Sequence, residues 1–81
     1  MRKDRVYLME VTGHMEITVN GEKQQLPEAL TVAGLLDRLK IVPERVVVEL
    51  NMAILKRAQL AATVIKPGDQ IEIVHFVGGG V

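Results

Sequence analysis

The sequence predicts an α+β fold, in which a mixed sheet of four to five strands carries one main helix on one face. Three features predict it: an alternating segment with a hairpin turn near residue 15, one amphipathic stretch between residues 31 and 41, and a second alternating segment from residue 70. The chain has 81 residues, 48% of them hydrophobic, which is enough for one small domain with a single core. One helix is available to cover one face of such a sheet.

The first strand is expected to begin at residue 15. Apolar and polar residues alternate from Met15 to Val19, which is the period of a half-buried strand. Asn20-Gly21 suits a tight hairpin turn because both residue types tolerate positive φ. We therefore expect a hairpin whose second strand covers Lys23 to Leu26.

A helix is expected near residues 31 to 41. Thr31 can serve as its N-cap, and Gly34 weakens the helix without forbidding it. Pro43 should end it, because the residue before a proline is pushed out of the α region. Apolar residues at spacings of three, four and seven form one stripe that should pack on the sheet: Val32, Leu35, Leu36 and Leu39.

The remaining segments complete the sheet. Three consecutive valines, Val46 to Val48, favour a central strand covered on both faces, and Ala53 to Leu55 fits a short strand after a turn. Gln59 to Ala62 fits a single helical turn. Lys66 to Asp69 has proline and glycine at the central positions of a type II turn, and the last strand follows over Gln70 to Val77. This order is a β-grasp layout, in which the first and last strands lie side by side.

Composition excludes several function classes. Ten basic and ten acidic residues balance, and one Tyr and one Phe offer no stacking platform, so we expect no nucleic-acid partner. The chain has no Cys, and His14 and His75 are isolated, so we expect no metal site. The apolar run Val6 to Met9 is too short for a signal sequence or a membrane span, which predicts a cytoplasmic protein with no membrane partner.

The chain divides into three parts. Residues 1–14 are expected to be an upstream extension, introduced by cloning or by an early start codon, with an extra edge strand through Val6, Leu8 and Val11 as the alternative. Residues 15–77 are expected to form the domain, and residues 78–81 a flexible glycine-rich tail. Glycines make the narrowest and most pliable segment that a peptide can offer, and the group that such a tail brings to chemistry is an α-carboxyl.

Several segments resemble one known family, the ubiquitin-like sulfur carriers of thiamin biosynthesis (ThiS), over roughly residues 15 to 80. The ending is the most specific of them. The matching segments are Ile17-Thr-Val-Asn-Gly21, Thr31-Val32 before Leu35-Leu36, Val46-Val-Val-Glu49 with Asn51, Lys66-Pro-Gly-Asp69, and Ile71-Glu-Ile-Val-His-Phe-Val-Gly-Gly-Gly80.

The resemblance implies a carrier and not an enzyme, with no catalytic residue of its own. An adenylylating (E1-like) enzyme would activate the Gly80 carboxylate with ATP, sulfur would replace the adenylate, and the thiocarboxylate would supply thiazole synthase. Gly78 and Gly79 would be the flexible leader. The chain itself should bind no cofactor, since it lacks a phosphate-binding glycine loop, and the sulfur donor is unidentified. Val81 departs from the family ending, so we expect either a precursor form or a form with a residue added by cloning, and activity in the species that ends at Gly80.

Two alternatives remain open at this point. A molybdopterin-synthase-type sulfur carrier shares the fold, the tail and the activation chemistry, and a ubiquitin-like protein modifier or binding module would use the tail differently. In the last strand, Val74 and Phe76 alternate with the isoleucines, so they form either an exposed docking patch for the activating enzyme or part of the core.

Overall fold

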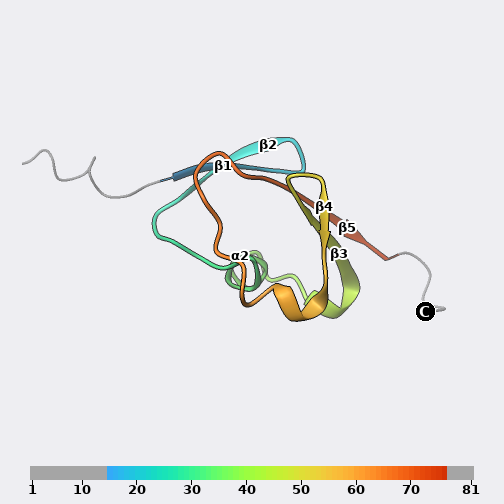
Figure 1. Ribbon diagram of the computed structural model, residues 1–81. Coiled ribbons are helices and arrows are strands. Elements are labelled where there is room, and N and C mark those ends of the chain that lie inside the picture. The colour runs from blue at the N-terminus through green and yellow to red at the C-terminus, as the bar shows by residue number, and fades with distance from the viewer. Residues whose placement is uncertain (1–14, 77–81) are drawn as a thin grey trace, which may run out of the picture.

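The computed structural model describes residues 15–76, which form a five-stranded mixed sheet with one α-helix on one side (Figure 1). This confirms the predicted fold class. The elements are β1 (Met15–Val19), β2 (Glu22–Leu26), α2 (Val32–Arg38), β3 (Val46–Leu50), β4 (Ala53–Leu55) and β5 (Gln70–His75), with short 3-10 helices η1 (Pro43–Arg45) and η2 (Arg57–Gln59).

The sheet has the order β2-β1-β5-β3-β4, so β5 is the central strand. It runs parallel to β1, with Thr18 beside Gln70, and antiparallel to β3, with Val48 beside Ile73. The expectation that the first and last strands lie side by side is confirmed. Only the start of β5 has a strand on each side, because its pairing with β1 ends at Ile71, and its carboxyl end pairs with β3 alone.

The predicted turns are present. Asn20 and Gly21 have φ of 50° and 84°, as a two-residue hairpin turn requires, and β2 begins one residue earlier than predicted. Gly68 has φ of 86° before β5, in agreement with the predicted type II turn. The turn between β3 and β4 also has positive φ, at Asn51 and Met52. These local conformations set the register of both hairpins.

Helix α2 begins as predicted but ends early. The Thr31 hydroxyl accepts a hydrogen bond from the Gly34 amide at 3.0 Å and caps the helix. At the other end, the Lys40 amide donates to the Asp37 carbonyl and the Ile41 amide to the Leu36 carbonyl. With Lys40 at φ of 62°, these bonds form a Schellman motif, which ends the helix five residues before Pro43.

The predicted role of Leu39 is wrong as a consequence. Leu39 follows the last helical residue and is 37% exposed, whereas Val32, Leu35 and Leu36 are buried. The motif turns the chain at this point, and Ile41 packs against the core in place of Leu39. Leu39, the fourth residue of the predicted apolar stripe, therefore does not pack between the helix and the sheet.

Two further expectations are corrected. Strand β3 is not covered on both faces: Val46 and Val48 are buried on the helix side, but Val47 is only half-buried on the other side. A single helix covers one face only, and it is the helix side that holds the core (Figure 1). The predicted helical turn at Gln59 to Ala62 begins two residues earlier, as the 3-10 helix η2, and continues to Ala62, whose amide donates to the Gln59 carbonyl at 3.1 Å.

The core lies between α2 and the sheet. Its residues come from every β-strand except β4, from the helix, and from the long connection before β5. They are Ile17, Val19, Leu26, Val32, Leu35, Leu36, Val46, Val48, Leu60, Ile65, Ile71 and Ile73. No helix in the described residues is long and apolar enough to cross a membrane.

Candidate functional site

Strand β5, which leads toward the glycine tail, is held on both sides by asparagine side chains. The Asn20 amide group donates to the Ile73 carbonyl at 3.2 Å, and its oxygen accepts from the Ile73 amide at 2.7 Å. At the other edge of β5, the Asn51 side chain accepts from the Gln70 amide at 2.8 Å and donates to Asp69 at 3.0 Å. These bonds extend the pairing of β5 where its neighbouring strands turn away.

The open face of the sheet carries an apolar patch beside the end of β5. Val74 is 55% exposed and lies opposite half-buried Val47 across the β3–β5 pair. Ile54, 65% exposed, extends the patch onto β4. Phe76, 51% exposed, follows the last residue of β5. We call Val47, Ile54, Val74 and Phe76 the outer patch.

Acidic residues border this patch. Glu49 lies opposite Glu72 on β5 and opposite Ile54 on β4. Like charges directly opposite each other on neighbouring strands are destabilising, so these two residues do not serve the stability of the sheet. In residues 15–76 the ion pairs are elsewhere, between Lys23 and Glu16 and between Arg57 and Glu44. The outer patch is thus apolar with a negative edge.

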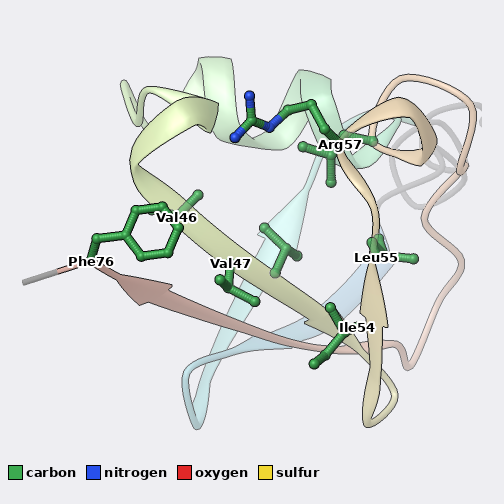
Figure 2. Close-up of a pocket in the computed structure, with 8 residues that line it drawn as sticks. Val46, Val47, Ile54, Leu55, Arg57 and Phe76 are labelled. Carbon is green, nitrogen blue, oxygen red and sulfur yellow. The ribbon is translucent and has the colours of Figure 1, made fainter. Parts of the chain in front are cut away.

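A groove of about 180 Å³ overlaps the outer patch, at the end of the molecule from which β5 leaves (Figure 2). It exists because β4 has only three residues and pairs with Val48–Leu50, which leaves the first half of β3 without a β4 neighbour. Figure 2 shows Arg57 above the apolar side chains and Phe76 at the β5 end. The lining residues are Val46–Val48, Ile54, Leu55, Arg57, Leu60 and Phe76.

The structure brings together only some of the predicted site residues. Val74 and Phe76 are exposed and close to the end of β5. Gly78, Gly79 and Gly80 lie outside the described residues, as does His14. His75 lies opposite Val46, and among residues 15–76 no three His, Cys, Asp or Glu side chains are grouped to hold a metal ion.

Sequence reasoning missed Val47, Ile54 and Arg57. Val47 was expected to be covered, and Ile54 and Arg57 had no assigned role. The alternation of β3 and β4 assigns Val47 and Ile54 to one face of their strands, but only the pairing of β3 with β5 puts Val47 beside Val74. No local pattern could have found Arg57, because its place at the groove depends on where η2 packs.

Comparisons with known protein families and with solved structures point to the same family. The model of the ThiS family matches residues 9–80. A crystal structure of the thiamine biosynthesis protein ThiS from Geobacter metallireducens superposes with a TM-score of 0.72 at 43% identity, covering 82% of this chain and 100% of that chain. The match to a ubiquitin-like β-grasp fold is therefore shown over the described domain.

Two curated relatives extend the comparison. A thiazole synthase from Magnetococcus marinus is 46% identical over 66 residues, which make up 82% of this chain but 20% of that protein. This chain thus spans about a fifth of the length of that relative. The uncharacterized protein ycf40 from Porphyra purpurea is 33% identical over 70 residues, 86% of this chain and 99% of that protein.

Proposed function

Because this chain belongs to the ThiS family, we propose that it is the sulfur carrier for formation of the thiazole moiety of thiamin. The observation that carries the proposal is the match to the ThiS structure from Geobacter metallireducens over that protein's whole length. The relatives named thiazole synthase favour the thiazole branch over a molybdopterin-type carrier. The chain acts as a substrate of enzymes and not as an enzyme.

The proposed chemistry takes place at the carboxyl group of Gly80. A carboxylate oxygen attacks the α-phosphorus of ATP in the active site of an adenylylating (E1-like) partner, forming the acyl adenylate and releasing pyrophosphate. A sulfide equivalent from an unidentified donor then adds to the acyl carbon, and AMP leaves with the oxygen. The product is a thiocarboxylate, which delivers its sulfur to thiazole synthase. ATP is bound by the partner, in a site that excludes water.

The way the fold holds β5, the strand that precedes the tail, is consistent with such a role. The bonds from Asn20 and Asn51 and the pairing with β1 and β3 hold β5 in the middle of the sheet. The four residues from Val77 to Gly80 can extend at most about 14 Å beyond Phe76. The two partners must therefore both bind near this end of the domain, where the outer patch lies.

Glycine residues suit the segment that carries the reacting carboxyl group. A narrow channel can close around Gly78 and Gly79 because they carry no Cβ atom. Val81 has a β-branched side chain, stiff at χ1, and its peptide bond to Gly80 leaves no free carboxylate on that glycine. We therefore assign activity to the species that ends at Gly80.

This assignment is tested with the full-length chain and a form ending at Gly80. Each is incubated with ATP, a cognate adenylylating enzyme and a sulfur source, and the intact mass is measured for replacement of one oxygen by sulfur. We expect conversion of the Gly80 form alone. Equal conversion of both forms without loss of Val81 would show that Gly80 is not the acyl site. If an enzyme active on its own carrier converts neither form, the binding-module alternative gains support.

We further propose that Val74 and Phe76 dock the activating enzyme. Phe76→Ser should weaken that complex by about tenfold or more, because a half-exposed aromatic anchor contributes more to binding than to folding. Binding is measured by calorimetry and the melting temperature by circular dichroism. Val64→Ser is the matched control, since Val64 is equally exposed, at 53%, but lies outside the outer patch. A large fall in melting temperature for Phe76→Ser would assign the ring to the core instead.

A further inference from the structure

The groove that overlaps the outer patch is large enough for one side chain and too small for a cofactor. Its volume is about 180 Å³. A cavity of about 150 Å³ holds a benzene ring, whereas sites for drug-sized ligands begin near 300 Å³. The walls come from β3, β4 and Leu60 and are apolar, so the side chain that fits is aliphatic or aromatic.

The rim of the groove adds a positive charge. The Arg57 side chain is 55% exposed, and its guanidinium is 4.0 Å from Glu44, whose side chain is 67% exposed. An ion pair this exposed and this long contributes little, so the guanidinium can turn to another carboxylate at small cost. Arg57 offers planar, bidentate recognition of such a carboxylate (Figure 2).

The groove also lies close in the chain to Gly80, the residue proposed to carry the sulfur. Phe76 lines it and directly precedes the segment that leads to Gly80. A protein that takes up the tail can therefore reach the groove from the same side. In the relatives named thiazole synthase, a segment like this chain makes up 20% of a longer protein, so a synthase surface lies within reach of a similar domain there.

We propose that the groove docks thiazole synthase through an apolar side chain that enters it and a neighbouring carboxylate that pairs with Arg57. The proposal rests on the proposed function and specifies how one of the two partners is recognised. The groove shares Phe76, Val47 and Ile54 with the outer patch. The activating enzyme and the synthase then occupy overlapping surfaces and bind one after the other.

The experiment measures binding of the full-length chain to thiazole synthase from the same organism by calorimetry at low and high salt. Arg57→Glu should weaken the complex by about tenfold or more, because it turns an attraction into a repulsion. Arg38→Glu, the same change at an exposed position on α2, should leave affinity within about twofold. Raising the salt concentration should weaken the wild-type complex more than the Arg57→Glu complex.

A second pair of variants tests the apolar half of the groove. Ile54→Ser removes an exposed side chain from its wall and should weaken the synthase complex, whereas Val64→Ser should not. Circular dichroism checks that both variants are folded. Equal affinities for Arg57→Glu and Arg38→Glu, with wild-type binding intact, would overturn the groove proposal and leave the carrier function standing.

Other occupants give different results. If Arg57→Glu weakens only the complex with the activating enzyme, the groove belongs to that enzyme and the assignment to thiazole synthase is wrong. If ultracentrifugation shows that the chain alone is a dimer that Arg57→Glu dissociates, the occupant is a second copy. If neither the wild-type chain nor the form ending at Gly80 binds either enzyme, the proposed function itself fails, and the groove proposal fails with it.

Discussion

The side chain of Asn20 pairs with β5 as a strand backbone would. Strand β1 ends at Val19. Beyond it, the side-chain amide of Asn20 donates one hydrogen bond to Ile73 and accepts one from it, along the edge of β5 that faces β1. The same residue has φ of 50°, which asparagine tolerates better than most residues. One residue thus makes the turn and extends the sheet at the strand that leads to the tail.

Replacement of Asn20 by Ala should lower the free energy of unfolding. Leaving the Ile73 amide and carbonyl without these partners costs about 1–3 kcal/mol, and a left-handed conformation adds about 1–2 kcal/mol for Ala. Urea unfolding measures the sum. Asn20→Gly is the matched control, since it removes the same hydrogen bonds without the backbone strain. A loss for Asn20→Ala no larger than for Asn20→Gly would show that the positive φ costs nothing.

Helix α2 has only seven residues, and Gly34 stands near its centre. A Cβ atom at this position would lie 3.4 Å from Leu30 Cδ2 and 3.4 Å from Thr31 Oγ1, which is ordinary contact. The glycine is therefore not required by lack of space. In a helix this short, the low helix propensity of one glycine is a large part of the summed propensity of the whole helix.

Gly34→Ala should stabilise the domain by about 0.5–1 kcal/mol, because alanine loses less backbone freedom on folding. Thermal unfolding of the variant checks this, with Ala33→Gly as a control that should shift stability in the opposite direction. A loss of stability in Gly34→Ala would mean that the new methyl group displaces the Thr31 hydroxyl and breaks the N-cap bond.

One core between α2 and the sheet holds the described domain together. Leu36 is 0% exposed between α2 and the sheet, and the Schellman motif places Leu39 at the surface although it lies only three residues further on. Since 12 of the residues between 15 and 76 form this core, each large side chain accounts for a substantial part of a stability that is small in total.

Leu36→Ala should cost about 2–5 kcal/mol through lost burial and the cavity left behind. Leu39→Ala, an identical change at a 37% exposed position, should cost less than about 1 kcal/mol. Both are measured by chemical unfolding. Similar losses at the two positions would return Leu39 to the core, and a loss below about 0.5 kcal/mol at Leu36 would contradict the observed helix packing.

Features that depend on neighbouring residues could be predicted from the sequence. Asn20-Gly21, Pro67-Gly68 and Thr31 specified two turns and a helix start, because their backbone and side-chain preferences act within a few residues. Alternation along the last strand separated Ile71 and Ile73 from Val74, but the sequence left open whether Val74 is exposed or part of the core. The order of these elements was enough to predict the fold class.

The early end of α2, the open face of β3 and the groove could not be predicted, because they depend on how the elements pack. The helix ends at Arg38, and Lys40 adopts the positive φ that closes it, a conformation usually taken by glycine, so the residue type gives no signal. Val47, Arg57 and Phe76 come from three separate segments, and they meet because β4 is short and β5 lies beside β3. Contacts of this kind depend on the packing of the whole sheet, which no local pattern of residues encodes.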